Sequence, residues 1–393
     1  MKKYQRAKKW GSKIVSALLI FLMCVWTCIP TFATARDSKV DLSLNCKSAI
    51  LMEASTGAVL YEQNADEALP PASVTKVMTL LLVMEAIEAG KIKYTDMIQA
   101  SANACSMGGS QIYLEENEEM SVEDLLKSVI IASANDAAVA LAESIAGTEQ
   151  TFVEMMNKKA QSLGMNNTYF ENTNGLDDTV QRHLTSARDI AIMSRELIKY
   201  PKITEYSSIW MDSIRNGEFG LTNTNRLVRF YKGATGLKTG STSKAGFCIS
   251  ATAQRDGMTL IAVIMGSSTR DIRNAAAVSL LDYGFANYTV YTNEGQKIEN
   301  IPVVKGTKAT LNAEYNRFSC VLRKSGDAKV TVEPSLPENV KAPVNKGDVI
   351  GQIVYKMGDN EIGKSDVIAA ETVERITFWA LFAEFFKNFA SIF

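Results

Sequence analysis

The clearest helical pattern in the first half of the chain runs from Val77 to Ile87. Apolar side chains recur there at three- and four-residue spacing, and the run stops at Gly90. The segment Ser73-Val74-Thr75-Lys76 lies at the head of this run. The pattern therefore predicts a helix with Ser73 on its first turn and Lys76 one turn further along the same face.

A mostly helical pattern also extends from about Ser121 to Leu197. Ser121-Val122-Glu123-Asp124 is typical of a capped helix start. Further helices are predicted at residues 136–145, 152–163, 189–198 and 273–285.

Alternating apolar positions predict strands in two places. Residues 49–52 and 58–61 flank Ser55-Thr56-Gly57, which indicates a hairpin. Residues 236–265 predict two strands with Asp256-Gly257 as the turn between them, and Lys238 and Thr239 begin the first of these strands. From Tyr288 to about Val373, short β-rich runs separated by Gly and Pro predict a small antiparallel β domain.

The first 35 residues have the features of a secretory signal peptide. A basic head precedes the apolar stretch Ile14 to Ile29, and Ala33-Thr34-Ala35 offers small residues for cleavage. The alternative is an uncleaved membrane anchor, for which the apolar stretch is short.

The last 18 residues, from Ile376 to Phe393, predict an amphipathic helix. Its aromatic residues recur at three- and four-residue spacing, and Glu384 and Lys387 interrupt the apolar face. Such a helix fits the membrane interface better than a membrane span. A helix docked on the body of the protein is the alternative.

Composition narrows the class of protein. The 393 residues are 46% hydrophobic and 22% charged, which is typical of a globular chain with more than one domain. Removal of residues 1–35 takes away six positive charges and no negative one, leaving a formal net charge of −7. A nucleic-acid-binding protein does not usually carry such a charge.

Cysteine and histidine are sparse. Four cysteines remain after residue 35, far apart and without a C-x-x-C pair, and they are expected to be packed thiols, although a pairing cannot be read from the sequence: Cys46, Cys105, Cys248 and Cys320. His183 is the only histidine, so a histidine-rich metal site is excluded. No cofactor is expected, and a hydrolase would more readily use a lysine than His183 as its base.

Ser73 and Lys76 are candidates for a nucleophile and its base. A hydroxyl and an amine stacked at a helix N-terminus suit acyl transfer, because the free backbone N–H groups stabilise developing negative charge. A helix cap and a solvated lysine are the alternative reading, and Ser241-Thr242-Ser243-Lys244 repeats the pattern in a stretch without helical period.

Two further segments carry candidate chemistry. Ser133-Ala134-Asn135 lies between two predicted helices, where a hydroxyl and a carboxamide can project into a cleft. Helix capping is the alternative, and Ser101-Ala102-Asn103 is a second copy. Gly236-Leu237-Lys238-Thr239-Gly240 would let an edge strand present an ammonium, a hydroxyl and close backbone to a peptide carboxylate.

The order Ser-x-x-Lys, Ser-x-Asn, Lys-Thr-Gly is found in penicillin-binding proteins and class A β-lactamases. From about Ser48 to Arg375 the chain resembles the serine-type D-Ala-D-Ala carboxypeptidases, the low-molecular-mass penicillin-binding proteins. The resemblance rests on the three motifs and on two more segments, Asn172-Thr173-Asn174-Gly175-Leu176-Asp177 and Thr222-Asn223-Thr224-Asn225. Asn174 departs from the family, in which His is frequent at this position.

The resemblance implies an α/β (α+β) penicillin-binding/β-lactamase-like transpeptidase domain with an antiparallel sheet and a helical subdomain. The expected organisation is a signal peptide at 1–35, the peptidase domain at 36–287, a small all-β domain at 288–373 and an amphipathic membrane-anchoring helix at 374–393. The expected location is the outer face of the cytoplasmic membrane, peripherally attached after export.

The resemblance also implies roles for the candidate residues. Ser73 would attack the bond between the last two D-alanines of a peptidoglycan stem peptide, with neutral Lys76 as base. Ser133 would relay protons to the leaving amine. Asn135 would bind the substrate amide, and Lys238 and Thr239 its carboxylate. The backbone N–H groups of Ser73 and of Ser241, the residue after Gly240, would form the oxyanion hole. β-Lactams would acylate Ser73.

Two alternative functions remain open. A β-lactamase would need a glutamate to activate the deacylating water, and Glu171 is the only candidate in the 160–185 region that stands out. A non-catalytic penicillin-binding wall scaffold would bind stem peptides without cleaving them.

Overall fold

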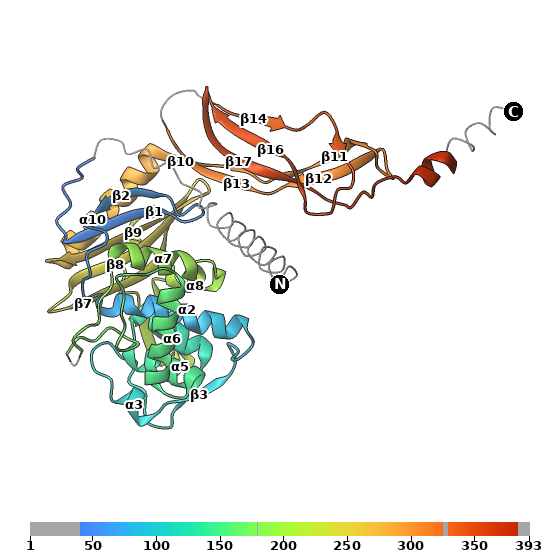
Figure 1. Cartoon of the computed structure of the whole chain (residues 1–393). Helices are drawn as coiled ribbons and strands as arrows, with labels where there is room; N and C mark the ends of the chain where they lie inside the picture. Colours follow the sequence, from blue (N-terminus) through green and yellow to red (C-terminus); the bar gives the residue numbers. More distant parts are fainter. Residues whose placement is uncertain (1–39, 179, 325–328, 384–393) are drawn as a thin grey trace, which may run out of the picture. The chain divides into compact units, whose positions relative to one another are not determined.

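The computed structural model of the chain describes residues 40–178, 180–324 and 329–383 (Figure 1). The predicted signal peptide at 1–35 lies outside the described residues, as do residues 384–393 of the predicted terminal helix.

A five-stranded antiparallel sheet carries the first part of the chain, in the order β2-β1-β9-β8-β7. Its strands are β1 (Ser48–Glu53), β2 (Val59–Gln63), β7 (Ala234–Thr242), β8 (Gly246–Arg255) and β9 (Met258–Ser267). The predicted hairpin is confirmed, since β1 pairs with β2. The Asp256-Gly257 turn is also confirmed, with φ of 49° and 77°.

The prediction of two strands over residues 236–265 was wrong, because the stretch before Asp256 is itself a hairpin. β7 and β8 are separated by a turn that the Thr242 hydroxyl closes by accepting the N–H of Ala245 at 3.0 Å. Lys238 and Thr239 consequently lie in the middle of β7 rather than at the start of a strand. β7 is an edge strand of the sheet, as predicted.

The two faces of the sheet bury different helices, as the period-two alternation of a strand requires. Ile50 belongs to a core shared with α2 and α7, whereas Leu51 belongs to a core shared with α10. The longer helices are α2 (Lys76–Glu88), α5 (Asn135–Ala146), α6 (Glu149–Ser162), α7 (Ala187–Leu197) and α10 (Arg270–Asn287). All five predicted helical segments are present, with ends shifted by at most three residues.

Shorter elements complete this part of the chain. The helices are η1 (Ala72–Thr75), α3 (Ala102–Cys105), α4 (Val122–Lys127), η2 (Ser128–Ala132), α8 (Pro201–Ser207), η3 (Arg215–Gly217) and α9 (Leu227–Phe230). The strands form two small pairs, β3 (Met97–Gln99) with β4 (Glu119–Ser121) and β5 (Met211–Ile214) with β6 (Phe219–Thr222). Ser121 caps α4 by accepting the N–H of Asp124 at 3.1 Å, as predicted.

Ser73 does not lie on the first turn of α2. It belongs to the separate 3-10 turn η1, and α2 begins only at Lys76. The φ of Ala72 is +49°, so helical backbone cannot extend N-terminal to Ser73.

The chain after α10 forms β-structure with its own core. One sheet has the order β14-β16-β17-β12-β11-β15, and β10 pairs with β13. The strands are β10 (Tyr288–Asn293), β11 (Gln296–Val304), β12 (Thr310–Tyr315), β13 (Phe318–Arg323), β14 (Val330–Ser335), β15 (Val340–Lys341), β16 (Val349–Met357) and β17 (Asn360–Ala369). The rings of Phe318 and Tyr355 stack in this region, with centroids 4.1 Å apart.

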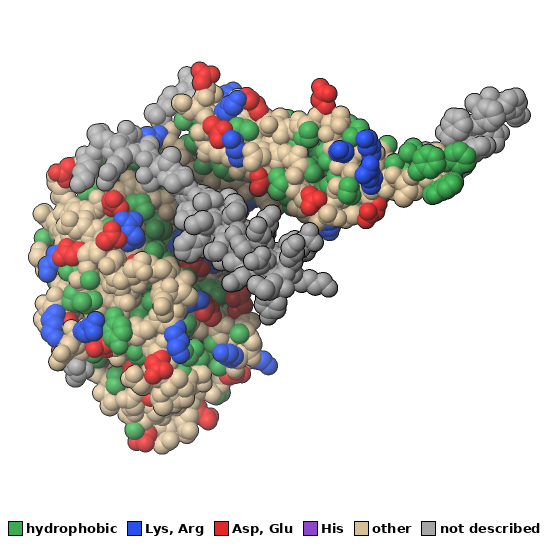
Figure 2. Space-filling model, in the orientation of Figure 1, with side chains coloured by type: hydrophobic (Ala, Val, Ile, Leu, Met, Phe, Trp, Pro, Cys, Tyr) green, Lys and Arg blue, Asp and Glu red, His purple; other side chains and the backbone are tan. Residues whose placement is uncertain are grey.

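Residues 378–383 form a short helix whose apolar side chains face solvent. Phe378 is 71% and Trp379 75% exposed, and Figure 2 shows hydrophobic side chains gathered on this segment. The predicted terminal helix is therefore present in its described part. None of the helices within the described residues is long and apolar enough to cross a membrane. The four cysteines are free thiols, as expected.

Candidate active site

The hydroxyl of Ser73 and the amine of Lys76 are in contact. The Ser73 Oγ and Lys76 Nζ atoms lie 2.9 Å apart, although the two residues belong to different helical elements. Ser73 is half-buried at the head of η1, and Lys76 is completely buried. The spacing prediction for this pair is confirmed even though the element boundary was wrong.

Two carbonyl oxygens complete the surroundings of the Lys76 amine. Its Nζ atom lies 2.5 Å from Oδ1 of Asn135 and 2.8 Å from the main-chain oxygen of Asn174. Both oxygens can only accept hydrogen bonds. A neutral amine has two N–H groups and one lone pair, so these contacts occupy both N–H groups and direct the lone pair at the Ser73 hydroxyl.

The charge balance favours this neutral amine. Burial lowers the pKa of Lys76 well below its ordinary value, and the nearby charge of Lys238 lowers it further. The carboxylate of Asp136 acts in the opposite direction. Burial is the largest cause, so the net effect on the pKa of Lys76 is a decrease.

Neither Ser133 nor Asn135 caps α5 through its side chain, because the N-cap of α5 is Ala134 and no side chain bonds there. Ser133 is instead the C-cap residue of η2. Ser133 is 4% exposed and has left-handed backbone (φ 65°, ψ 30°) at the end of the π-helical segment η2. The Asn135 carboxamide is held from both sides, because its Nδ2 donates to the carbonyl of Gly108 at 2.6 Å.

Edge strand β7 passes directly beside η1. A Cβ atom added to Gly240 would lie 2.7 Å from the backbone nitrogen of Ser73, so only glycine permits this approach. Ser241, the next residue, is exposed. The segment 238–241 is thereby brought to Ser73.

Lys238 is a buried cation with few partners. It is 1% exposed, and within the described part of the chain its Nζ makes a single hydrogen bond, 3.1 Å to the carbonyl of Thr239, and no ion pair. Burial, together with the charge of Arg273, lowers the pKa of Lys238 to about 7. A ligand carboxylate would satisfy this ammonium.

Thr224 links two of the three motif segments. Its hydroxyl lies 2.8 Å from that of Thr239, and its backbone N–H donates to the carbonyl of Ile131 at 3.1 Å. The sequence placed Thr224 in a family-like segment but gave it no role. The residues around Thr224 in the sequence show no pattern that would predict this contact.

The loop around residues 172–177, a family-like segment to which the sequence assigned no role, contacts the residues of the candidate site. Asn174 supplies a carbonyl to Lys76, and Asp177 accepts the hydroxyl of Thr242 at the end of β7. Lys244 donates to the carbonyl of Asp177 at 2.5 Å. The second Ser-x-x-Lys copy is thus used to fasten this loop.

The second copy of the Ser-x-Asn pattern, at Ser101, and the candidate glutamate of a β-lactamase, Glu171, make contacts of their own. Ser101 caps α3 and bonds to Glu143, away from Lys76. The carboxylate of Glu171 accepts the backbone N–H groups of Gln181 and Arg182 at 2.9 and 2.8 Å. Glu171 is therefore bound to its own loop.

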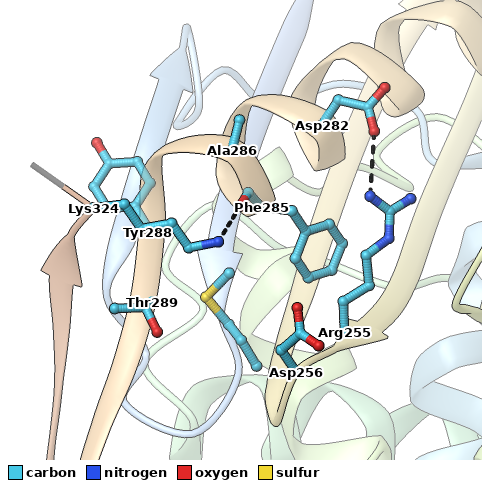
Figure 3. Close-up of a pocket in the computed structure, with 9 residues that line it drawn as sticks. Arg255, Asp256, Asp282, Phe285, Ala286, Tyr288, Thr289 and Lys324 are labelled. Carbon is cyan, nitrogen blue, oxygen red and sulfur yellow. Dashed lines mark hydrogen bonds and ion pairs between the residues drawn. The ribbon is translucent and has the colours of Figure 1, made fainter.

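A cavity of about 370 Å³ lies elsewhere, beside α10 and the β8–β9 turn (Figure 3). Arg255 pairs with Asp282 there at 3.6 Å, and Lys324 donates to the carbonyl of Phe285 at 2.7 Å. None of the candidate residues lines it. Within the described ranges, His, Cys, Asp and Glu also form no group of three that could hold a metal ion.

A serine in contact with a buried lysine, beside an edge strand that carries a second buried lysine, is typical of serine acyl-transfer hydrolases of the penicillin-binding fold. The comparisons with known proteins agree. Residues 33–269 match the D-alanyl-D-alanine carboxypeptidase family (peptidase S11), and residues 285–375 match the C-terminal domain of penicillin-binding protein 5. The chain belongs to the D-alanyl-D-alanine carboxypeptidase family, a family of serine peptidases.

Individual relatives cover most of the chain. It is 42% identical to D-alanyl-D-alanine carboxypeptidase DacF of Bacillus subtilis (strain 168), over 93% of this chain and 96% of that protein. Penicillin-binding protein 5 from Haemophilus influenzae is similar in structure, with a TM-score of 0.76 and 32% identity over 86% of this chain and 100% of that one.

The ampicillin-bound form of penicillin-binding protein D2 from Listeria monocytogenes is similar in structure over a smaller share of the chain. Its TM-score is 0.58 and its identity 31%, over 63% of this chain and 100% of that one. The predicted fold class, with its helical and antiparallel β parts and a following β domain, is confirmed.

Proposed function

We propose that the chain removes the terminal D-alanine from peptidoglycan stem pentapeptides through an acyl-enzyme on Ser73. The observation that carries the proposal is the coordination of Lys76, in which two carbonyl oxygens leave the lone pair for the Ser73 hydroxyl. Lys76 takes the hydroxyl proton while Oγ attacks the carbonyl carbon between the two D-alanines.

The oxyanion that forms is held by the backbone N–H groups of Ser73 and Ser241. The close approach of Gly240 to the Ser73 nitrogen supports this assignment, because it brings the two N–H groups to one place. When the C–N bond breaks, the leaving amine receives a proton through Ser133, and free D-alanine departs. Water then hydrolyses the ester at Ser73.

Residues of β7 and α5 bind the substrate. The ammonium of Lys238 and the hydroxyl of Thr239 hold the terminal carboxylate, since Lys238 lacks an anionic partner among the described residues. The second hydrogen of the Asn135 amide nitrogen, which Gly108 does not use, binds the substrate amide.

Release of D-alanine from a synthetic stem pentapeptide tests this function. The purified chain is expected to release one D-alanine per peptide, and Ser73→Ala to release none while still binding the peptide. No release by the wild-type chain, with unchanged peptide binding by Ser73→Ala, would instead indicate a non-catalytic scaffold.

Deacylation separates the peptidase from a β-lactamase. Because Glu171 is bound to the backbone of its own loop, it is not placed to activate water, and β-lactams should form a long-lived adduct on Ser73. Rapid turnover of nitrocefin without trapped enzyme would favour a β-lactamase.

We also propose that the terminal segment attaches the exported enzyme to the outer face of the cytoplasmic membrane. Phe378, Trp379 and Phe382 are exposed and contact one another, which suits insertion among lipid headgroups. Co-sedimentation with neutral lipid vesicles should be lost when Phe378 and Trp379 are both changed to serine. Unchanged co-sedimentation would exclude this attachment.

A further inference from the structure

The peptide group between Ala72 and Ser73 consists of the carbonyl of Ala72 and the N–H of Ser73, and the orientation of one fixes that of the other. Its N–H is the proposed oxyanion donor of Ser73, and its C=O points the opposite way, because N–H and C=O of a trans peptide are antiparallel. Ala72 has φ +49°, a conformation that alanine rarely adopts. The direction of the Ser73 N–H therefore depends on what holds the carbonyl of Ala72.

A chain of hydrogen bonds holds that carbonyl. The Thr75 hydroxyl lies 2.8 Å from the oxygen of Ala72, to which it donates, and 2.7 Å from Nε2 of His183. On the other side of the ring, Nδ1 accepts the backbone N–H of Glu171 at 3.0 Å. Since Nδ1 accepts, the ring proton is on Nε2 and is donated to Thr75, which leaves the Thr75 proton for Ala72.

The surroundings shield this series of hydrogen bonds from water and keep the His183 ring uncharged. His183 is 5% exposed, and its ring makes a T-shaped contact with the ring of Phe170, with centroids 5.6 Å apart. Burial lowers the pKa of His183 to about 4, although the carboxylates of Glu171 and Asp177 act to raise it. The ring is therefore neutral near pH 7.

Gly175 closes the remaining side. A Cβ atom there would lie 1.8 Å from the oxygen of Ala72 and 2.8 Å from the hydroxyl of Thr75. The carbonyl is thus covered by backbone, and its hydrogen bond to Thr75 is shielded from water. Hydrogen bonds of this kind polarise one another and are stronger away from solvent.

We infer that His183 is a positioning residue for the oxyanion hole: through Thr75 it orients and polarises the Ala72–Ser73 peptide, so that the Ser73 N–H is aimed at the developing oxyanion. This inference rests on the proposed function of Ser73. It assigns a role in the reaction to the one histidine of the chain, which touches neither substrate nor nucleophile.

Two substitutions of His183 test its two hydrogen bonds separately, because each can keep one bond and lose the other. His183→Gln can place an amide N–H where Nε2 stands and so keep the donor to Thr75. His183→Asn can keep an acceptor for the N–H of Glu171 but is too short to reach Thr75. Thr75→Val removes the hydroxyl at nearly constant volume, and Arg182→Gln, on the same loop, is the control for general disturbance.

Acylation by benzylpenicillin provides the kinetic measurement. His183→Asn and Thr75→Val should slow the covalent step about tenfold or more, less than the 10²–10³ lost when an oxyanion donor is removed outright. Their affinity for the non-covalent complex should be unchanged, because no substrate contact is lost. His183→Gln and Arg182→Gln should retain most of the wild-type rate.

Infrared spectroscopy of the acyl-enzyme provides a readout that stability alone does not move. A weaker hydrogen bond to the acyl carbonyl raises its stretching frequency. We expect a higher frequency in His183→Asn and Thr75→Val, and a wild-type frequency in His183→Gln.

The outcomes separate this inference from the proposed function. Wild-type rate and frequency in both His183→Asn and Thr75→Val would overturn the role of His183. So would a His183→Gln variant that is folded yet as impaired as His183→Asn. If the wild-type chain itself forms no adduct on Ser73, the proposed function fails first.

Discussion

Replacement of Lys238 by arginine tests how the site holds a carboxylate. Lys238 is buried with one hydrogen bond, and its pKa is lowered to about 7 by burial and by Arg273. Only the charged ammonium attracts the substrate carboxylate. In the wild-type chain, kcat/KM should therefore fall as pH rises above about 7, about tenfold for each pH unit.

The pH at which activity declines differs between the free and the bound enzyme. A bound carboxylate favours the charged form of Lys238 and raises its pKa. The alkaline decline of kcat should accordingly lie at higher pH than that of kcat/KM. An arginine stays charged throughout this range, so Lys238→Arg should lose the decline.

The assay is the pH dependence of D-alanine release between pH 6 and 10. From pH 7 to pH 9 the wild-type chain should lose about 50-fold in kcat/KM, and Lys238→Arg should lose little, whatever its absolute rate. Lys244→Arg is the matched control, because Lys244 bonds to the Asp177 carbonyl instead, and it should keep the wild-type decline. The reasoning is refuted if Lys238→Arg keeps the same decline as wild type.

Three further substitutions have defined outcomes. Gly175→Ala should lower the melting temperature by several degrees and abolish acylation, because a Cβ would lie 1.8 Å from the Ala72 oxygen at φ +87°; a calorimetric scan matching wild type would contradict this. Thr224→Val should raise KM for the pentapeptide about tenfold with little change in kcat, since Thr239 loses its hydroxyl partner but Ile131 keeps the backbone contact; an unchanged KM argues against it. The pKa of His183 is about 4 in the folded chain against 6.5 for an unperturbed histidine, so its neutral form contributes up to about 3 kcal/mol above pH 6.5, which is lost as pH falls towards 4. Urea unfolding should show the stability gap between wild type and His183→Gln shrinking over that range, and a constant gap would be inconsistent with it.

The fold was predictable wherever a periodic pattern was long. The apolar run from Val77 to Ile87 gave α2 almost to its ends, and the alternation around Asp256-Gly257 gave β8 and β9. The hairpin between β7 and β8 was missed because its turn is closed by the side chain of Thr242 instead of a strong Asn-Gly or Asp-Gly pair.

The start of α2 shows how tertiary contacts override a local pattern. The apolar period gives no reason to separate Ser73 from the helix. Ala72, the residue before Ser73, has a positive φ that stops helical backbone from extending towards the N-terminus, and its carbonyl is contacted by Thr75 and covered by Gly175. Gly175 is about 100 residues away in the sequence, so no local signal could reveal it.

The motif side chains of the candidate site could be named from the sequence, but the backbone groups around them could not. Ser73, Lys76, Ser133, Asn135 and the Lys238–Ser241 segment carry motif residues, and the structure places Ser73 against Lys76 and Gly240, and Asn135 against Lys76. The main-chain carbonyl of Asn174 contacts Lys76, but the sequence contains no signal for it, because every residue has a main-chain carbonyl. The sequence favoured a lysine rather than His183 as the base, and the positioning role inferred for His183 acts through Thr75, which no local pattern reveals.

The central claim is that Ser73, activated by Lys76, is the nucleophile. The most direct measurement is mass spectrometry of tryptic peptides after brief treatment with benzylpenicillin. The account predicts one adduct per chain, located by fragmentation on Ser73 in the peptide that ends at Lys76, and no adduct in Lys76→Met at neutral pH. An adduct on another residue, or full acylation of Ser73 in the Lys76→Met variant, would contradict it.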